Sequence, residues 1–281
     1  MKEESLLKWT INTVKRFGIR PRQEIGQNYV VDPNLIECLI EAARIGSDEV
    51  VLEVGAGIGA LTVKLAEIAK KVIAVEMDEN SIRALSKTLS GIDNVNIVMD
   101  DVMNINLPKV DKVVSNLPFS ISTPFTFKLL REGSFKLAVL TYQKEVAERM
   151  LARPGEGDYS RLSVVTALLA DVERVRDFPP EAFYPKPKVS STVVAIRKKN
   201  FDMVDWIDLE DLLKILFSQR RRKLKKAIDS YCKIKDLDKT ELISRIDEKM
   251  LMKRVFELEP KDFLYLGRVM GGKHVQPKYH G

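Results

Sequence analysis

Histidine is almost absent from this chain of 281 residues. The two histidines, His274 and His280, both lie within the last eight residues. Imidazole is the usual acid–base group near neutral pH and the commonest metal ligand in proteins. We therefore exclude histidine-based catalysis and histidine-ligated metal from the core, and we expect no metal site.

Cysteine and long apolar runs are scarce as well. Cys38 and Cys232 lie far apart and neither has a CxxC partner, so neither a disulfide framework nor a thiolate zinc site is supported. The apolar runs fall short of the roughly 18 residues that a membrane span needs. The N-terminus, MKEESLLKWT, lacks the apolar region of a signal peptide. We expect a soluble, cytoplasmic protein with no membrane partner.

Acidic residues are missing from one strongly basic stretch. The net charge is only +6, but residues 219–226, QRRRKLKK, carry six positive charges and no negative one. Residues 2–22 carry six basic and two acidic residues. Such blocks suit a phosphate backbone, although a solvated helix face is the alternative. The predicted RNA contacts here are Arg220, Arg221, Arg222 and Lys223.

The apolar pattern predicts a doubly wound α/β fold. Residues 49–54 and 71–76 are continuous apolar runs of strand length, with a helical segment between them. Further strands are predicted at 94–99, 111–116, 135–143, 172–178 and 190–197, with helices in the intervening segments. Strand–helix alternation of this length is typical of a Rossmann-like, mostly parallel sheet.

The pattern changes near residue 200. Residues 206–232, 239–250 and 259–270 all have helical spacing, and no strand is predicted after Lys199. We predict two domains, an α/β domain at 1–199 with a basic N-terminal segment and a small all-helical domain at 200–281. The helical domain would bind RNA or the ribosome.

A glycine loop directly follows the first long strand. The stretch VGAGIGA places Gly55, Ala56, Gly57 and Gly59 between a strand and a helix, where backbone approaches a ligand closely. The same spacing nearly fits the dinucleotide fingerprint, so the loop by itself leaves NAD open as the cofactor.

Acidic residues near the strand ends favour S-adenosylmethionine. Glu53 precedes the loop, where it suits the cationic methionine end of that cofactor and would oppose a pyrophosphate. Glu76 ends the second strand and could accept the ribose hydroxyls, and Asp101 follows the third and could accept from the adenine amine. Solvation of strand ends is the alternative for each acid. Three of them at the carboxyl edge of one sheet favour a binding site.

The stretch NLPF, at the end of the fourth strand, predicts the catalytic group. Asn116 supplies a side-chain carbonyl and Leu117 a main-chain carbonyl, which Pro118 holds in place. Two such acceptors could hold and orient an exocyclic amine, while Phe119 stacks on the base. The alternative is an ordinary Asn-x-Pro turn with a core phenylalanine.

A second aromatic element, FYPKPKVSS at 183–191, precedes the last strand. Phe183 could close the opposite face of a flipped-out base, and Lys186 and Lys188 could contact phosphates. A proline-rich surface loop is the alternative reading of this stretch.

Together these stretches resemble the small-subunit ribosomal RNA adenine N6,N6-dimethyltransferases. EIGQNYVVD, VLEVGAGIGALT, AVEMDE, DDVMNI, NLPFSIST, FYPKPKVSSTVV and LFSQRRRKLKKAI occur in the family's order. The resemblance implies S-adenosylmethionine as cofactor, two adjacent adenines near the 3′ end of the RNA as target, and the immature 30S subunit as partner. It also implies a role in ribosome biogenesis. The composition suggests an archaeal source, and we expect a monomer.

The resemblance also implies roles for individual residues. The target base would lie between Phe119 and Phe183, beside Asn116. Two positions depart from the family: Phe119 replaces the common Tyr, and Val30 replaces the more usual Leu. The predicted cofactor contacts are Gln27, Asn28, Val30, Gly55, Ala56, Gly57, Gly59, Glu76, Met77, Asp101, Val102 and Asn116.

Three other functions remain open at this point. The nearest is the related large-subunit rRNA adenine methyltransferase of macrolide resistance. Another is a ribosome-assembly factor whose RNA binding matters more than its catalysis. The most distant is a NAD-dependent oxidoreductase, which titration with the two cofactors would separate.

Overall fold

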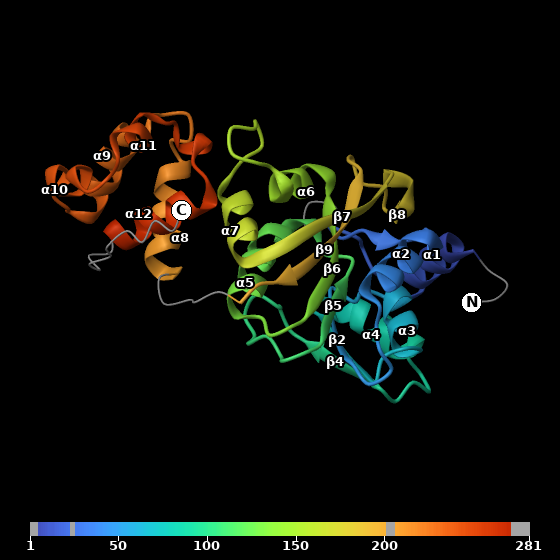
Figure 1. Ribbon diagram of the computed structural model, residues 1–281. Helices are drawn as coiled ribbons and strands as arrows, with labels where there is room; N and C mark the ends of the chain where they lie inside the picture. The colour runs from blue at the N-terminus through green and yellow to red at the C-terminus, as the bar shows by residue number, and fades with distance from the viewer. Residues whose placement is uncertain (1–4, 23–25, 201–205, 271–281) are drawn as a thin grey trace. The chain divides into compact units, whose positions relative to one another are not determined.

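The computed structural model describes residues 5–22, 26–200 and 206–270 (Figure 1). His274 and His280 lie outside these ranges. The contacts group the chain into two compact units, one of residues 1–147 with 170–198 and the other of residues 148–169 with 199–281. Residues 148–169 therefore group with the C-terminal helices. The division at residue 200 into two domains stays a prediction.

A seven-stranded sheet forms the centre of the first unit, in the order β4-β3-β2-β5-β6-β9-β7. Strands β2 to β6 pair in parallel, whereas β9 runs antiparallel to both β6 and β7. The strands are β2 (Val50–Val54), β3 (Lys71–Glu76), β4 (Val95–Met99), β5 (Lys112–Ser115), β6 (Leu137–Gln143), β7 (Ala170–Phe178) and β9 (Ser191–Lys198). The predicted Rossmann-like α/β class is confirmed.

Helices cover both faces of this sheet. Figure 1 shows α2, α3 and α4 on one side of the strands and α5 on the other. The helices of this part of the chain are α1 (Leu6–Arg16), α2 (Pro33–Ala43), α3 (Ala60–Ala66), α4 (Glu79–Thr88), α5 (Ser122–Glu132) and α6 (Lys144–Leu151). Asp32 caps α2, because its side chain accepts from the Asn34 N–H at 2.9 Å.

Apolar strand residues and one face of α2 and α3 form the main core. Leu35, Leu39 and Leu65 are fully buried against strand residues such as Val72 and Val139. Replacing such a leucine by alanine costs about 2–5 kcal/mol, because the transfer free energy is lost and a cavity remains. The strands that present the candidate site are therefore held rigidly by their own buried side chains.

A small second sheet was not predicted from the sequence. Strand β1 (Tyr29–Val30) pairs antiparallel with β8 (Phe183–Tyr184). Both strands have only two residues, which is too short for a periodic pattern to be recognised. Their pairing joins the N-terminal segment to the proline-rich loop, although the two lie far apart in the sequence.

The second unit is helical in its described residues. Its helices are α7 (Arg161–Leu169), α8 (Trp206–Phe217), α9 (Leu224–Lys235), α10 (Lys239–Ser244), α11 (Glu248–Met252) and α12 (Pro260–Met270). Within the part of the chain that the structure describes, no helix has the length and apolar character needed to cross a membrane.

The predicted continuous helix over 206–232 is wrong at its centre. The chain leaves the helix after Phe217, and Lys223 forms an isolated antiparallel bridge with Arg254. The backbone N–H groups of Val255 and Phe256 donate to the Arg222 and Arg220 carbonyls, both at 3.1 Å. Crowded like charges disfavour a helix, and this backbone pairing supplies alternative hydrogen bonds. The predicted helix over 239–250 is likewise divided, into α10 and α11.

Candidate active site

The glycine loop joins β2 to α3 and lies against two other segments. At Gly57 φ is +57°, and an added Cβ would lie 3.0 Å from Cε1 of Tyr29. At Gly55 an added Cβ would lie 2.8 Å from Cδ of Pro118. Side chains at these two positions would push away the N-terminal segment and the NLPF motif. Glycine is therefore required for the loop to approach both.

Glu76 organises the end of β3 through backbone N–H groups. Its Oε2 accepts from Gly57 at 2.8 Å, and its Oε1 accepts from Met77 at 2.8 Å and Asp78 at 2.9 Å. Burial raises the pKa of the Glu76 carboxyl, and these N–H donors partly oppose that shift. The carboxyl is thus fixed in orientation at the mouth of the glycine loop.

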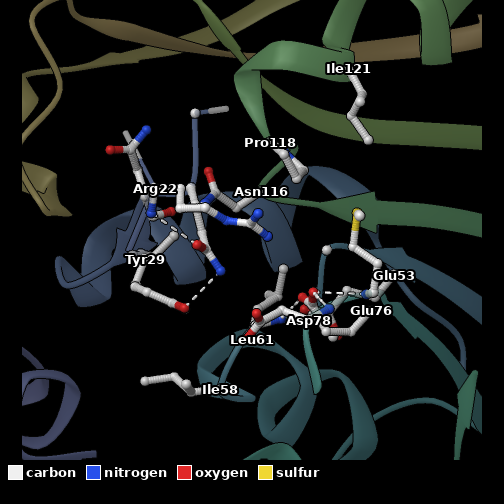
Figure 2. Close-up of a pocket in the computed structure, with 18 of the residues that line it drawn as sticks. Arg22, Tyr29, Glu53, Ile58, Leu61, Glu76, Asp78, Asn116, Pro118 and Ile121 are labelled. Carbon is white, nitrogen blue, oxygen red and sulfur yellow. Dashed lines mark hydrogen bonds between the residues drawn. The ribbon is translucent and has the colours of Figure 1, made fainter. Parts of the chain in front are cut away.

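Glu53 differs from Glu76 in lacking such donors. It is 2% exposed, and its Oε2 has no hydrogen-bond partner among the described residues. Burial raises the pKa of this carboxyl to about 8; the Thr62 hydroxyl opposes that shift, and the nearby Glu76 charge adds a smaller contribution to it. Figure 2 shows Glu53 and Glu76 on one side of the pocket, with Arg22 and Tyr29 on the other.

The residues that follow β4 form the remaining acidic part. Asp101 lines the pocket of Figure 2, which we call the main pocket and which the glycine loop, Glu76 and Asn116 also line. Its Oδ1 accepts from the Met103 N–H at 2.9 Å. Val102 is buried and lines a smaller adjoining cavity, together with Met77, which is 56% exposed. An apolar pair beside a carboxylate suits a flat heteroaromatic ring with a polar edge.

The N-terminal segment closes the pocket from another side. The Gln27 side chain accepts from the Arg22 N–H and donates to the Tyr29 hydroxyl, both at 3.1 Å. The Tyr29 hydroxyl in turn lies 3.3 Å from Oγ of Ser81 in α4. Gln27 therefore braces this segment, in addition to lining the pocket.

The NLPF motif follows β5 and begins a short 3₁₀ turn, Phe119–Ile121. Nδ2 of Asn116 donates to the Asn28 main-chain carbonyl at 2.9 Å, while Oδ1 of Asn116 is buried without a partner among the described residues. Leu117 is 1% exposed and anchors the motif in the core. An unpaired buried acceptor is costly, so this oxygen is suited to a donor from a ligand.

The two candidate stacking rings meet edge to face. The Phe119 and Phe183 centroids lie 6.3 Å apart, with an interplanar angle of 67°. Phe183 is 3% exposed, because strand β8 turns it into the core. These two rings do not form a parallel slot in the structure, and of the two only Phe119 lines the outer cavity, a hollow beside Gly26, Asn28 and Lys188. The role of Phe183 as a second stacking ring stays a prediction.

That outer cavity adjoins the main pocket. Gly26 and Asn28 line both of them, so the two are neighbours around the N-terminal segment. Lys186 and Lys188 line the outer cavity as well, and Lys186 pairs with Glu181. The other lining residues are Phe119, Ser120, Gln143, Pro187 and Val189.

Most predicted cofactor contacts gather at the main pocket. Gln27, Asn28, Val30, Gly55, Ala56, Gly57, Glu76, Met77, Asp101 and Asn116 line it, Val102 lines the adjoining cavity, and Gly59 lies behind the loop against Leu85. Sequence reasoning missed Arg22, Tyr29, Ser120 and Gln143. Only Tyr29 had a signal, since it lies between two predicted contacts.

The predicted RNA contacts of the second unit have unequal surroundings. Arg221, Arg222 and Lys223 are exposed. The Arg220 guanidinium donates to the Gly157 carbonyl at 2.6 Å and lies 5.7 Å from the centroid of the Phe256 ring. Arg220 therefore has a packing role. Across the described residues, no group of His, Cys, Asp and Glu side chains could hold a metal ion.

Comparison with known proteins gives consistent matches. The family model for ribosomal RNA adenine dimethylase matches residues 18–262. A probable ribosomal RNA small subunit methyltransferase A of Methanothermobacter thermautotrophicus is 42% identical over 257 residues, which are 91% of this chain and 93% of that protein. The protein of the same name from Pyrococcus abyssi is 43% identical over 254 residues, 89% of this chain and 91% of its own length.

Solved structures agree with these matches. A dimethyladenosine transferase from Plasmodium falciparum is 33% identical, with a TM-score of 0.75, over 84% of this chain and 95% of that one. The 23S rRNA methyltransferase ErmE is 24% identical, with a TM-score of 0.63, over 87% of this chain and 100% of its own. The second similarity concerns the fold alone.

Proposed function

The chain belongs to the ribosomal RNA adenine dimethylase family, and we propose that it methylates two adjacent adenines near the 3′ end of small-subunit rRNA during assembly of that subunit. It is an rRNA adenine dimethyltransferase that uses S-adenosylmethionine, which removes the NAD alternative. Relatives named small subunit methyltransferase A support the choice of rRNA. The partner would be the immature 30S particle, and the enzyme would act as a monomer.

The observation that carries this proposal is the unpaired Oδ1 of Asn116. Nδ2 of the same amide donates to the Asn28 main-chain carbonyl at 2.9 Å. This hydrogen bond fixes the orientation of the amide, and therefore the direction in which the unpaired Oδ1 points. It lies at the main pocket, and Asn28 connects that pocket to the outer cavity. An acceptor placed at this junction suits an amine that must meet a methyl donor.

The chemistry of the adenine amine explains why such an acceptor is needed. The lone pair of N6 is delocalised into the ring, so the nitrogen is a weak nucleophile. Asn116 Oδ1 and the Leu117 main-chain carbonyl would each accept an N6–H bond and direct the lone pair toward the methyl group. Formation of the N6–C bond would break the bond between the methyl group and the sulfonium sulfur, leaving S-adenosylhomocysteine, and the nitrogen would lose a proton to solvent. No imidazole is required.

The pocket residues fit S-adenosylmethionine. Three buried polar atoms at the pocket lack partners among the described residues: Asn28 Oδ1, Glu53 Oε2 and Asn116 Oδ1. Glu76 would accept from the ribose, Asp101 and Met77 would hold the adenine, and the Gly57 backbone would approach the ligand closely. When bound, the cofactor supplies an electrophilic methyl group.

The outer cavity would receive the target base. Phe119 presents its ring there, and a stacked base gains roughly 1–3 kcal/mol in single-strand contacts. Lys186 and Lys188 would contact the phosphates that flank the base. The second unit would contact other phosphates of the RNA through Arg221, Arg222 and Lys223. The buried Phe183 would hold the Phe119 ring in position through their edge-to-face contact.

Mapping the modified nucleotides tests this proposal. The purified protein is incubated with labelled S-adenosylmethionine and with immature small subunits or large subunits that lack the modification. We expect label in two adjacent adenines near the 3′ end of small-subunit rRNA. Label confined to large-subunit rRNA would favour the large-subunit alternative and would overturn the proposal.

A further inference from the structure

Glu53 is a buried acid that the methyl-transfer geometry does not use. It is the last residue but one of β2, lines the main pocket and is only 2% exposed. Its Oε2 has no hydrogen-bond partner among the described residues. The Thr62 hydroxyl in α3 is near enough to lower the pKa of this carboxyl, but it too is buried without a hydrogen bond to a described residue.

The other acidic side chains that line this pocket already accept hydrogen bonds from backbone N–H groups, and the one cation labelled in Figure 2, Arg22, lies on the opposite side from Glu53. Glu76 accepts three backbone N–H groups, and Asp78 caps α4 by accepting from the Ser81 N–H at 2.8 Å. Asp101 accepts from the Met103 N–H. On the opposite side Figure 2 shows Arg22 and Tyr29, with Tyr29 bonded to Gln27. Among the acids that line the pocket, Glu53 alone has a buried oxygen with no described donor.

A carboxylate in that position would be unstable without a positive partner. A buried, unpaired charge costs several kcal/mol, and such a group takes up a proton instead. The nearby Glu76 adds repulsion to this cost. In agreement, burial raises the pKa of the Glu53 carboxyl to about 8. Near pH 7 Glu53 is therefore predominantly protonated before a ligand enters.

We propose that Glu53, the acid expected at the cationic end of the cofactor, holds a proton in the ligand-free pocket and releases it to solvent when the positively charged methionyl end of S-adenosylmethionine binds. The proposal rests on the cofactor assigned above. The ligand charge replaces the proton as the partner of the carboxylate, so one proton leaves and no other group changes. The affinity for S-adenosylmethionine then rises with pH up to about 8, where Glu53 is ionised in the absence of ligand.

S-adenosylmethionine carries two positive groups at its methionyl end, a sulfonium and an ammonium, and either one could pair with the Glu53 carboxylate. The sulfonium is lost when the methyl group is transferred, whereas the ammonium remains in the product, S-adenosylhomocysteine. If Glu53 faces the sulfonium, transfer of the methyl group removes its partner, and the carboxylate regains a proton before the product leaves. If Glu53 faces the ammonium, substrate and product are held alike.

Calorimetric titration of the full-length protein tests the proposal. Binding heats are measured at pH 7 in two buffers of different ionisation enthalpy, and the difference gives the number of protons released. The ligands are S-adenosylmethionine, S-adenosylhomocysteine and 5′-methylthioadenosine, which lacks both positive groups. The α-amine of the ligand also titrates near pH 8 and can contribute to the proton count. The number of protons released is therefore compared between the wild-type protein and Glu53→Gln.

We expect the wild-type protein to release close to one proton more than Glu53→Gln on binding S-adenosylmethionine. If S-adenosylhomocysteine causes the same extra proton release, the partner of Glu53 is the ammonium. If S-adenosylhomocysteine causes no extra release, the partner is the sulfonium. Glu53→Gln should lose about tenfold or more in affinity for S-adenosylmethionine, because its neutral amide cannot pair with the positive charge of the ligand. It should keep its affinity for 5′-methylthioadenosine, which also shows that the variant is folded.

Glu76→Gln is the matched control, because it changes an acid of the same pocket that would serve the ribose. It should weaken all three ligands to a similar degree. It should still release most of the proton, because burial is the largest cause of the raised Glu53 pKa and the Glu76 charge is a smaller one. The inference is overturned if wild-type and Glu53→Gln proteins release equal numbers of protons. That result would leave the proposed function intact, whereas failure of the wild-type protein to bind S-adenosylmethionine would contradict the proposed function itself.

Discussion

The side-chain amide of Asn116 and the main-chain carbonyl of Asn28 are joined by a hydrogen bond of 2.9 Å, across 88 residues of sequence. Asn116 follows the central strand β5, and Asn28 lies just before the short strand β1. The bond directs the free Oδ1 of Asn116 and makes that direction depend on the N-terminal segment. The direction of the proposed amine acceptor and the position of the N-terminal segment at the pocket are therefore linked by one contact.

Replacing Gly57 by alanine should weaken cofactor binding. Its φ of +57° disfavours a side chain by about 1–2 kcal/mol, and the new Cβ would lie 3.0 Å from Cε1 of Tyr29. The matched control is Gly91→Ala, where φ is +85° but no atom lies within 4 Å of the added Cβ. We expect both variants to lose similar thermal stability and Gly57→Ala alone to lose affinity for S-adenosylmethionine by titration. Equal affinities would contradict the role of the loop.

Phe119 should tolerate tyrosine but not alanine. The ring lines the outer cavity and meets Phe183 edge to face, so Phe119→Ala removes the stacking surface and that contact. A loss of roughly 1–3 kcal/mol predicts a decrease in kcat/KM for rRNA of about fivefold to 150-fold. Phe119→Tyr keeps the ring and should remain within a few-fold of wild type. Steady-state methylation assays measure both, and a nearly active Phe119→Ala would refute the stacking role.

The stability of the ligand-free protein should depend on pH through Glu53. Burial raises the pKa of this carboxyl in the folded state to about 8, above its ordinary value of 4.5. The contribution of Glu53 is therefore fully present below pH 4.5 and is lost as the pH rises through 8. One proton gives a slope of about 1.4 kcal/mol per pH unit in that window.

The variant Glu53→Gln cannot titrate and isolates this effect. The free energy of unfolding, from urea denaturation between pH 5 and 8, should fall more steeply with pH for the wild-type protein than for the variant. Since other groups titrate alike in both proteins, the difference between the two curves reports Glu53. Parallel curves would show that the folded protein does not hold this proton.

Arg220 and Arg221 should respond differently to alanine, although they are neighbours. Arg220 donates to the Gly157 carbonyl and lies over the Phe256 ring, so Arg220→Ala should lower the melting temperature. Arg221 is exposed, so Arg221→Ala should leave the melting temperature unchanged and weaken binding to an rRNA fragment. The slope of log affinity against log salt should decrease by about one. The same slope for Arg221→Ala and the wild-type protein would argue against a phosphate contact.

Local patterns in the sequence predict most of the sheet and the arrangement of the pocket. The apolar run before Gly55 and the acids Glu76 and Asp101 lie at the ends of adjacent parallel strands, and such ends meet at one edge of the sheet. For that reason spacing alone brings the glycine loop, the acids and Asn116 together. These predictions need no knowledge of distant contacts.

The parts that sequence reasoning missed depend on distant contacts. The pairing of β1 with β8 decides that Phe183 is buried, and the backbone pairing with residues 253–256 interrupts the basic helix. Gln143 and Ser120 line the outer cavity through the packing of separate segments. The unpaired state of Glu53 also cannot be predicted from its neighbours in the sequence, because it depends on which donors the folded chain brings near.

The most direct test of the account is the substitution Asn116→Ala, with Asn96→Ala on the exposed side of β4 as its matched control. Methyl transfer from labelled S-adenosylmethionine to immature small subunits is measured for both variants, together with cofactor affinity by titration. Because Asn116 would supply the acceptor that orients the adenine amine, we expect Asn116→Ala to lose at least a hundredfold in methyl transfer, about 2.7 kcal/mol of transition-state stabilisation, and to keep cofactor affinity within about tenfold. Methyl transfer by Asn116→Ala at the rate of Asn96→Ala would contradict the central claim.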